Sequence, residues 1–113
     1  MTDEVPAKRV RVAVALRHEV LIEVNIANEE GKAGIEPAEL GAFIARCPVK
    51  VAGLMTMPPF AADPEQSRPH FAALRELARE HGLHQLSMGT SQDYRVAAEE
   101  GATIVRLGTT LYA

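Results

Sequence analysis

The feature that most constrains the fold of this chain is a regular change of hydrophobic period between residues 20 and 107. Short runs rich in Val, Ile and Leu alternate with segments in which apolar residues recur every three or four positions. Runs of the first kind are typical of buried strands, and segments of the second kind are typical of amphipathic helices. Repeated βαβ units of this sort predict an α/β fold with a parallel sheet and right-handed crossovers.

Four strands and three helices are expected from this pattern. Pro37 suits a first helical position, and Pro48 prevents that helix from continuing. Gly82 ends the longest helix, and the run from Thr90 to Asp93 has the form of a capping box that opens the last one. We expect strands at 20–26, 49–57, 83–88 and 103–107, and helices at 37–47, 64–81 and between 90 and 101.

Residues 1–19 fit this alternation less well. From Arg9 to Leu16, larger apolar residues (Val or Leu) alternate with Arg or Ala, which favours a strand, while a short helix is nearly as compatible. We therefore leave the segment open between strand and helix. The remaining residues, 20–113, are expected to form one domain, because 113 residues suffice for a single modest domain.

Composition and charge exclude several classes of function. A formal net charge of −3 gives no long-range attraction to nucleic acid or to anionic membranes. No apolar run approaches the ~20 residues that span a bilayer, and residues 1–19 lack the apolar core of an export signal, so a cytoplasmic location is expected. The single cysteine, Cys47, and the four histidines show no spacing typical of a metal or nucleophile site.

Glycine and hydroxyl residues follow the last two predicted strands. Ser91 lies in a small-residue turn after the third strand, and Gly108 and Thr109 follow the fourth. Ligands of parallel sheets gather at the carboxyl ends of the strands, where backbone amides and hydroxyls can hold a phosphate without a lysine. Helix caps and turns explain the same residues, so both explanations remain open.

Two further polar residues are candidates for ligand contact. Asn25 ends the first predicted strand on the parity of Glu23, opposite an apolar row, where a polar group needs a partner. A structural pair and a ligand contact are both compatible with Asn25. Lys32 lies in the following loop, where it contacts either solvent or a ligand.

Five segments, taken in order, resemble the pyridoxal phosphate homeostasis proteins of the YggS/PROSC type. They follow one another in family order, and the match spans nearly everything from Val20 to the end. The segments are LIEVNI (21–26), KAGI (32–35), GLMTMP (53–58), LSMGTSQD (86–93) and VRLGT (105–109).

The resemblance implies a (β/α) barrel related to the alanine racemase N-terminal domain. It also implies binding of pyridoxal 5′-phosphate through a Schiff-base lysine, with cofactor carriage and buffering and no established turnover. By resemblance, Ser91, Gly108 and Thr109 would hold the phosphate, Arg106 would face the pyridine nitrogen, and Met88 would lie near the ring or phosphate. A permanently charged arginine at that nitrogen disfavours ring protonation, which suits a carrier.

Two departures from the family pattern bear on function. The turn reads Gly89-Thr90-Ser91 where the family usually has Gly-Met-Ser. A complete barrel takes about 250 residues, and the match corresponds to the family's C-terminal half. Lys8 lacks the flanking pattern of the family's Schiff-base lysine, so we expect about half of a TIM-like barrel without its covalent anchor.

The sequence therefore predicts a truncated or split pyridoxal phosphate-binding protein of cofactor homeostasis. Such a chain would bind the cofactor non-covalently, or phosphate alone, and would associate with itself or with a missing N-terminal half. The alternative is a non-catalytic interaction module whose cofactor site has decayed.

Overall fold

The structure is a computed structural model that describes residues 12–16 (backbone only), 19–31 and 33–107. Its strands are β1 (Val12–Leu16), β2 (Glu19–Glu23), β3 (Lys50–Met55), β4 (Gln85–Thr90) and β5 (Ile104–Arg106). Its α-helices are α1 (Leu40–Arg46), α2 (Arg68–Glu80) and α3 (Tyr94–Glu99). The 3₁₀ turns η2 (Pro37–Glu39) and η3 (Pro64–Ser67) precede α1 and α2.

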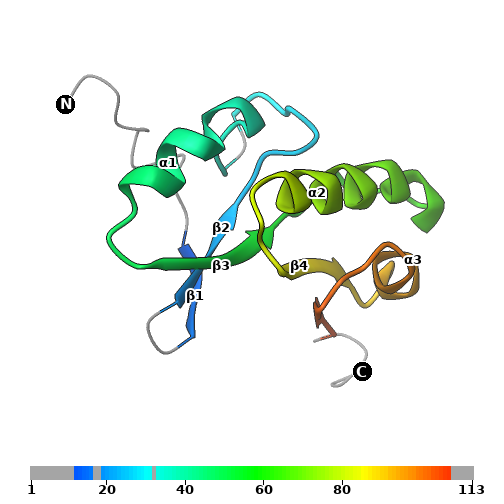
Figure 1. The fold of residues 1–113 in the computed structure, drawn as a ribbon. Coiled ribbons are helices and arrows are strands. Elements are labelled where there is room, and N and C mark those ends of the chain that lie inside the picture. The colour runs from blue at the N-terminus through cyan, green and yellow to red at the C-terminus, as the bar shows by residue number, and fades with distance from the viewer. Residues whose placement is uncertain (1–11, 17–18, 32, 108–113) are drawn as a thin grey trace.

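The strands form one sheet in the order β1-β2-β3-β4-β5 (Figure 1). Strands β2 to β5 run parallel to their neighbours, which confirms the α/β fold built from βαβ units. Strand β1 pairs antiparallel with β2, so residues 12–16 form a strand, one of the two structures left open for the N-terminal segment. The predicted boundary between an N-terminal segment (residues 1–19) and a domain (residues 20–113) stays a prediction.

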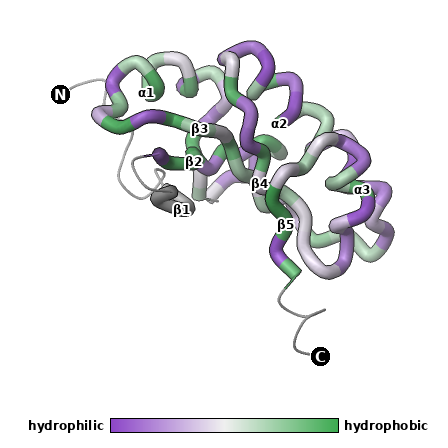
Figure 2. The backbone as a smooth tube through the Cα atoms, turned by 60° about the horizontal axis from the view of Figure 1, so that its bottom comes forward, coloured by the Kyte–Doolittle hydropathy of each residue, from purple (hydrophilic) through white to green (hydrophobic). Residues whose placement is uncertain are grey.

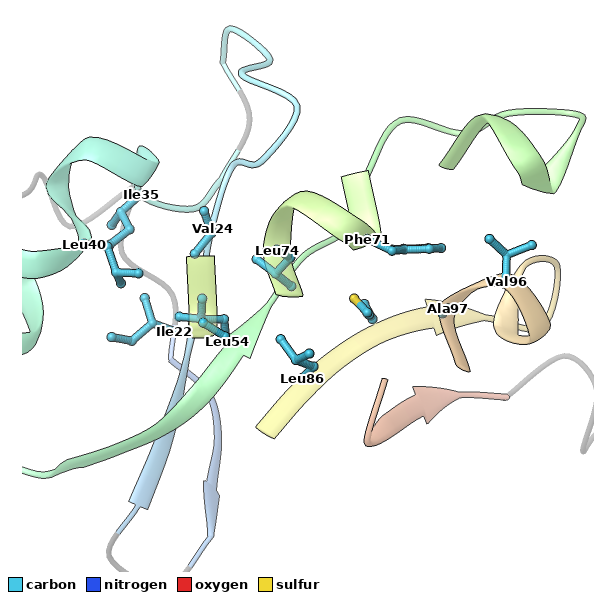
Figure 3. Close-up of a cluster of buried hydrophobic side chains, with 12 residues drawn as sticks. Ile22, Val24, Ile35, Leu40, Leu54, Phe71, Leu74, Leu86, Val96 and Ala97 are labelled. Carbon is cyan, nitrogen blue, oxygen red and sulfur yellow. The ribbon is translucent and has the colours of Figure 1, made fainter. Parts of the chain in front are cut away.

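The three helices pack against one face of the sheet and close a single hydrophobic core (Figures 1 and 2). Phe71 and Leu74 of α2 are fully buried in this core, together with Leu54 of β3 (Figure 3). Val96 and Ala97 attach α3 to the same cluster. The core therefore fixes the positions of the strands and of the turns that follow them.

Helix boundaries show where local sequence decides structure. Pro37 lies in the first turn of η2, where the side chains of Glu36 and Glu39 form a capping box. Of the capping box expected at Thr90 to Asp93, one bond is present: the Asp93 carboxylate accepts the backbone N–H of Thr90 at 2.7 Å. This bond closes the turn before α3, which begins at Tyr94.

A network of ion pairs joins α2 to α3 beyond the core. Arg68 donates to Glu65, Glu99 and Glu100, and Arg75 donates to Glu76 and Glu100. Glu100 is the shared acceptor, and its side chain is 14% exposed. Hydrogen bonds from Arg68, opposed by burial and aided by Arg75, hold the pKa of Glu100 below its ordinary value.

This lowered pKa predicts acid sensitivity. A carboxylate whose pKa is lower in the folded state stabilises the fold above its unfolded pKa, which is about 4.3, and loses that contribution as the pH falls through the folded pKa. We expect the urea midpoint to fall when the pH drops below about 4.3, and to fall less in Glu100→Gln. Glu80→Gln removes the same charge from an exposed site on α2. An identical pH profile for Glu100→Gln and Glu80→Gln would contradict the prediction.

Candidate functional site

Buried polar side chains gather on the face of the sheet opposite the helices. Ser87 of β4 lies between Leu86 and Met88, which both enter the core, so the strand's alternation points Ser87 to the other face. The same argument places Glu23 of β2 opposite Ile22. Ser87 and Glu23 are each 5% exposed; Glu23 is the last residue of β2, and Ser87 is the third of the six residues of β4.

Arg106, at the end of β5, lies in the middle of this polar group. Its Nη1 donates to Ser87 Oγ at 2.7 Å, and its Nη2 donates to the carbonyl oxygen of Thr56 at 3.2 Å. The side chain thus reaches from β5 across β4 to the end of β3. Burial lowers the pKa of Arg106, while the negative charges of Glu23 and Asp93 oppose that shift. The guanidinium keeps its charge in this half-buried position.

A β-bulge in β4 shapes the edge of this group. Ser87 pairs with Ile104 and Thr90 pairs with Arg106, so β4 carries one more residue than β5 over that interval. Gly89 lies inside the bulge with φ at +100°, a backbone conformation that favours glycine. A Cβ atom there would come within 2.6 Å of the Ala97 Cβ, so glycine also permits α3 to pack closely.

The turn that carries Ser91 is held from two sides. Asp93 accepts from the Thr90 backbone N–H, and the Asp93 N–H donates back to the Thr90 carbonyl at 3.2 Å. The Gln92 side-chain amide donates to the Ala61 carbonyl and so ties the turn to the loop after β3. Ser91 is partly buried in this fixed turn, at the carboxyl end of β4.

A surface groove borders this turn at Gln92 and Asp93. Residues of η3 and the start of α3 line the rest of it, including Glu65, Tyr94, Arg95 and Glu99. Glu65 and Glu99 both pair with Arg68, so the groove carries charges of both signs.

Asn25 has a structural task in the loop after β2. Its Nδ2 donates to the Glu29 carbonyl at 2.7 Å, and its Oδ1 accepts the Glu29 N–H at 3.0 Å. These bonds close the loop from 25 to 29 and use both polar ends of the side chain. The structural alternative therefore accounts for Asn25, and ligand contact stays a prediction that this geometry does not support.

The other predicted site residues fall into two groups. The Met88 side chain is fully buried in the helix-covered core, so it does not lie on the face that carries Ser87 and Arg106. The expectation that Met88 lies near the ring or phosphate stays a prediction, which a side chain on the helix-covered face does not support. Lys32, Gly108 and Thr109 lie outside the described residues.

The sequence analysis did not single out Ser87 and Thr56. Both are buried polar residues in otherwise apolar strand segments, which is a signal that the sequence does carry. Within the described part of the chain, no cluster of three or more His, Cys, Asp or Glu side chains could hold a metal ion. None of the helices described is long and apolar enough to cross a membrane.

Comparison with known proteins places this site in a family. The family model for the alanine racemase N-terminal domain matches residues 5–113. The chain belongs to this family. The alanine racemase N-terminal domain is TIM-barrel-like, which agrees with the parallel βαβ units of the structure.

Curated relatives and solved structures narrow the position within the alanine racemase N-terminal domain family. The pyridoxal phosphate homeostasis protein of Aquifex aeolicus is 53% identical over 104 residues, covering 83% of this chain and 46% of the relative. The Homo sapiens protein of that name is 33% identical over 126 residues, covering 99% of this chain and 46% of the relative. The structure of PipY from Synechococcus elongatus with pyridoxal phosphate bound matches with a TM-score of 0.67 and 30% identity, covering 84% of this chain and 49% of PipY. These relatives confirm the resemblance seen in the sequence, and the chain spans about half of their length.

Proposed function

We propose that this chain binds the phosphate and ring-nitrogen end of pyridoxal 5′-phosphate as part of a cofactor-homeostasis protein. The observation that carries the proposal is the position of Arg106, whose guanidinium lies across β4 and is held by Ser87 and the Thr56 carbonyl. A half-buried cation beside hydroxyl groups suits a phosphorylated pyridine, because both the ring nitrogen and the phosphate accept hydrogen bonds.

Each candidate residue has a distinct task in this proposal. Ser91 offers a hydroxyl and a neighbouring turn amide to the phosphate, and Gly108 and Thr109 would supply further amides. Arg106 faces the ring nitrogen and keeps it unprotonated, since a permanent positive charge disfavours a second one nearby. When bound, pyridoxal phosphate supplies an aldehyde and an electron-withdrawing ring. The residues of this chain bind and orient that group.

Binding by this chain alone is expected to be non-covalent. The resemblance assigns covalent attachment to a lysine on a strand that this sequence does not match, and Lys8 lacks its flanking pattern. Pyridoxal phosphate mixed with the chain should therefore give little long-wavelength absorbance. A lysine-dependent absorbance band of full stoichiometry would contradict this part of the proposal.

Association with another chain follows from the same expectation of half a barrel. The sheet is open, with β1 and β5 at its edges, and an edge strand invites pairing with a second copy or with a complementary N-terminal half. We expect sedimentation to show concentration-dependent dimers or larger species. A compact monomer at the highest concentration tested would be the contrary result.

The binding test compares two site variants with one matched control. In calorimetric titrations of the full chain with pyridoxal phosphate, Arg106→Gln should weaken binding about 10-fold or more, the equivalent of a charge-assisted hydrogen bond. Ser91→Ala should weaken binding several-fold, and Ser91→Thr should retain most of it. Arg79→Gln removes an equal charge from α2, where the side chain is 75% exposed, and should bind like the wild type.

The same titrations distinguish the alternative function. A non-catalytic interaction module with a decayed cofactor site would show negligible binding in the wild type and in both site variants. Equal affinity of the wild type, Arg106→Gln and Arg79→Gln would remove the basis for the proposal.

A further inference from the structure

Ser87 makes the contact that most restricts Arg106. Its hydroxyl oxygen accepts from Arg106 Nη1 at 2.7 Å, and the Ser87 side chain is buried at 5% exposure. The bond joins β4 to β5 on the face of the sheet without helices. Hydrogen bonds of this type, between a charged donor and a buried acceptor, are short and have a defined direction.

A second contact fixes the plane of the guanidinium. Arg106 Nη2 donates to the carbonyl of Thr56, the residue after β3, so the two terminal nitrogens are held at two different places in the sheet. Thr56 is held in turn, because its hydroxyl donates to the Val24 carbonyl at 3.0 Å and its N–H donates to the Ser87 carbonyl at 3.2 Å. Since the guanidinium is planar and rigid, two fixed points leave it little rotational freedom.

The backbone explains why Ser87 meets an arginine that pairs further along the sheet. Arg106 is level with Thr90 in the pairing of β4 with β5, and Ser87 is three residues earlier. Because of the bulge at Gly89, Ser87 pairs with Ile104, and Arg106 lies only two residues beyond that level on β5. The long side chain of Arg106 spans the remaining distance to Ser87. The arrangement thus depends on a local irregularity as well as on the two side chains.

We propose that Ser87 is a positioning residue that sets the orientation in which Arg106 meets the ring nitrogen of a phosphopyridine. The inference rests on the proposed function and adds a specificity role to it. The ring would be recognised through Ser87 and Arg106, and the phosphate through the turn that carries Ser91. Ser87 therefore determines how much better the chain binds the phosphorylated ring than phosphate alone.

A comparison of two ligands tests this division of tasks. The affinities of the full chain for pyridoxal phosphate and for inorganic phosphate are measured in the wild type, Ser87→Ala and Ser87→Thr. Ser87→Ala should weaken binding of pyridoxal phosphate about tenfold and leave phosphate binding unchanged. Ser87→Thr keeps the hydroxyl and should restore the preference. An equal loss for both ligands, or no loss for either, would overturn the proposal.

A measurement without ligand separates this inference from the proposed function. The rotation of the Arg106 guanidinium about its Cζ–Nε bond can be followed by nitrogen NMR in the isolated chain. Ser87→Ala should speed this rotation about tenfold or more, because one of the two anchoring bonds is lost. If the wild type bound no pyridoxal phosphate, the proposed function would fail, and unchanged rotation in Ser87→Ala would overturn the positioning role independently. If Ser87→Ala does not fold, Ser87→Cys replaces it, since a thiol is a weak acceptor of similar size.

Discussion

Phe71→Ala should destabilise the chain by about 3–5 kcal/mol, the range expected when a large aromatic is removed from a packed core. Phe71 is fully buried in the cluster that joins α2 to the sheet and to Val96 of α3 (Figure 3). Its loss leaves a cavity at the point where the two helices meet. Small domains have a free energy of unfolding of about 5–15 kcal/mol, so this variant should be partly or fully unfolded at ordinary temperatures.

Phe60→Ala is the matched control for this prediction. Phe60 is 85% exposed, so the same truncation removes no core contact and should change the free energy of unfolding by less than about 0.5 kcal/mol. Urea titrations of both variants, followed by circular dichroism, give the comparison. Equal stability losses for Phe71→Ala and Phe60→Ala would contradict the packing described above.

Gly53→Ala should be the second most damaging change. Gly53 of β3 faces Gln85 of β4, and a Cβ atom at Gly53 would come within 2.0 Å of the Gln85 carbonyl oxygen. A backbone atom in the middle of a sheet cannot move aside as a flexible side chain can. The two strands would have to separate, so we expect a loss of about 3 kcal/mol, at the upper end of the range for overpacking.

Gly41→Ala adds the same methyl group at a tolerant position. Gly41 is exposed on α1, and an added Cβ would meet only the His81 side chain, at 3.4 Å. Because alanine favours a helix over glycine, this variant should be neutral or more stable by up to about 1 kcal/mol. The opposite signs of the two Gly→Ala changes, measured by urea titration, are the expected result. A neutral Gly53→Ala would show that β3 and β4 do not pair as closely as described.

The hydrophobic period predicted the elements of this fold well, because burial on one face decides them. Pro37 and Gly82 mark helix ends in the structure as they do in the sequence, since backbone geometry at these residues is intrinsic. Helix α3 lies within the expected range of 90 to 101, and the residues from Thr90 to Asp93 close the turn that precedes it.

The candidate site was harder to predict from sequence for a related reason. The search of strand ends drew attention to Arg106, but its partner Ser87 lies on β4 and its partner Thr56 directly follows β3. Their meeting depends on sheet register and on the β4 bulge, neither of which is encoded in a local pattern. For Asn25 the partner is local: its side chain forms hydrogen bonds with the Glu29 backbone in the adjacent loop and not with residues at other strand ends.

The most direct test of the central claim is chemical-shift mapping of the full chain with pyridoxal 5′-phosphate. We expect the perturbed backbone amides to cluster at 87–93 and at 106–109, with the Arg106 side-chain signals among those that shift most. Perturbations confined to the groove beside Glu65 and Tyr94, or none at millimolar ligand, would contradict it.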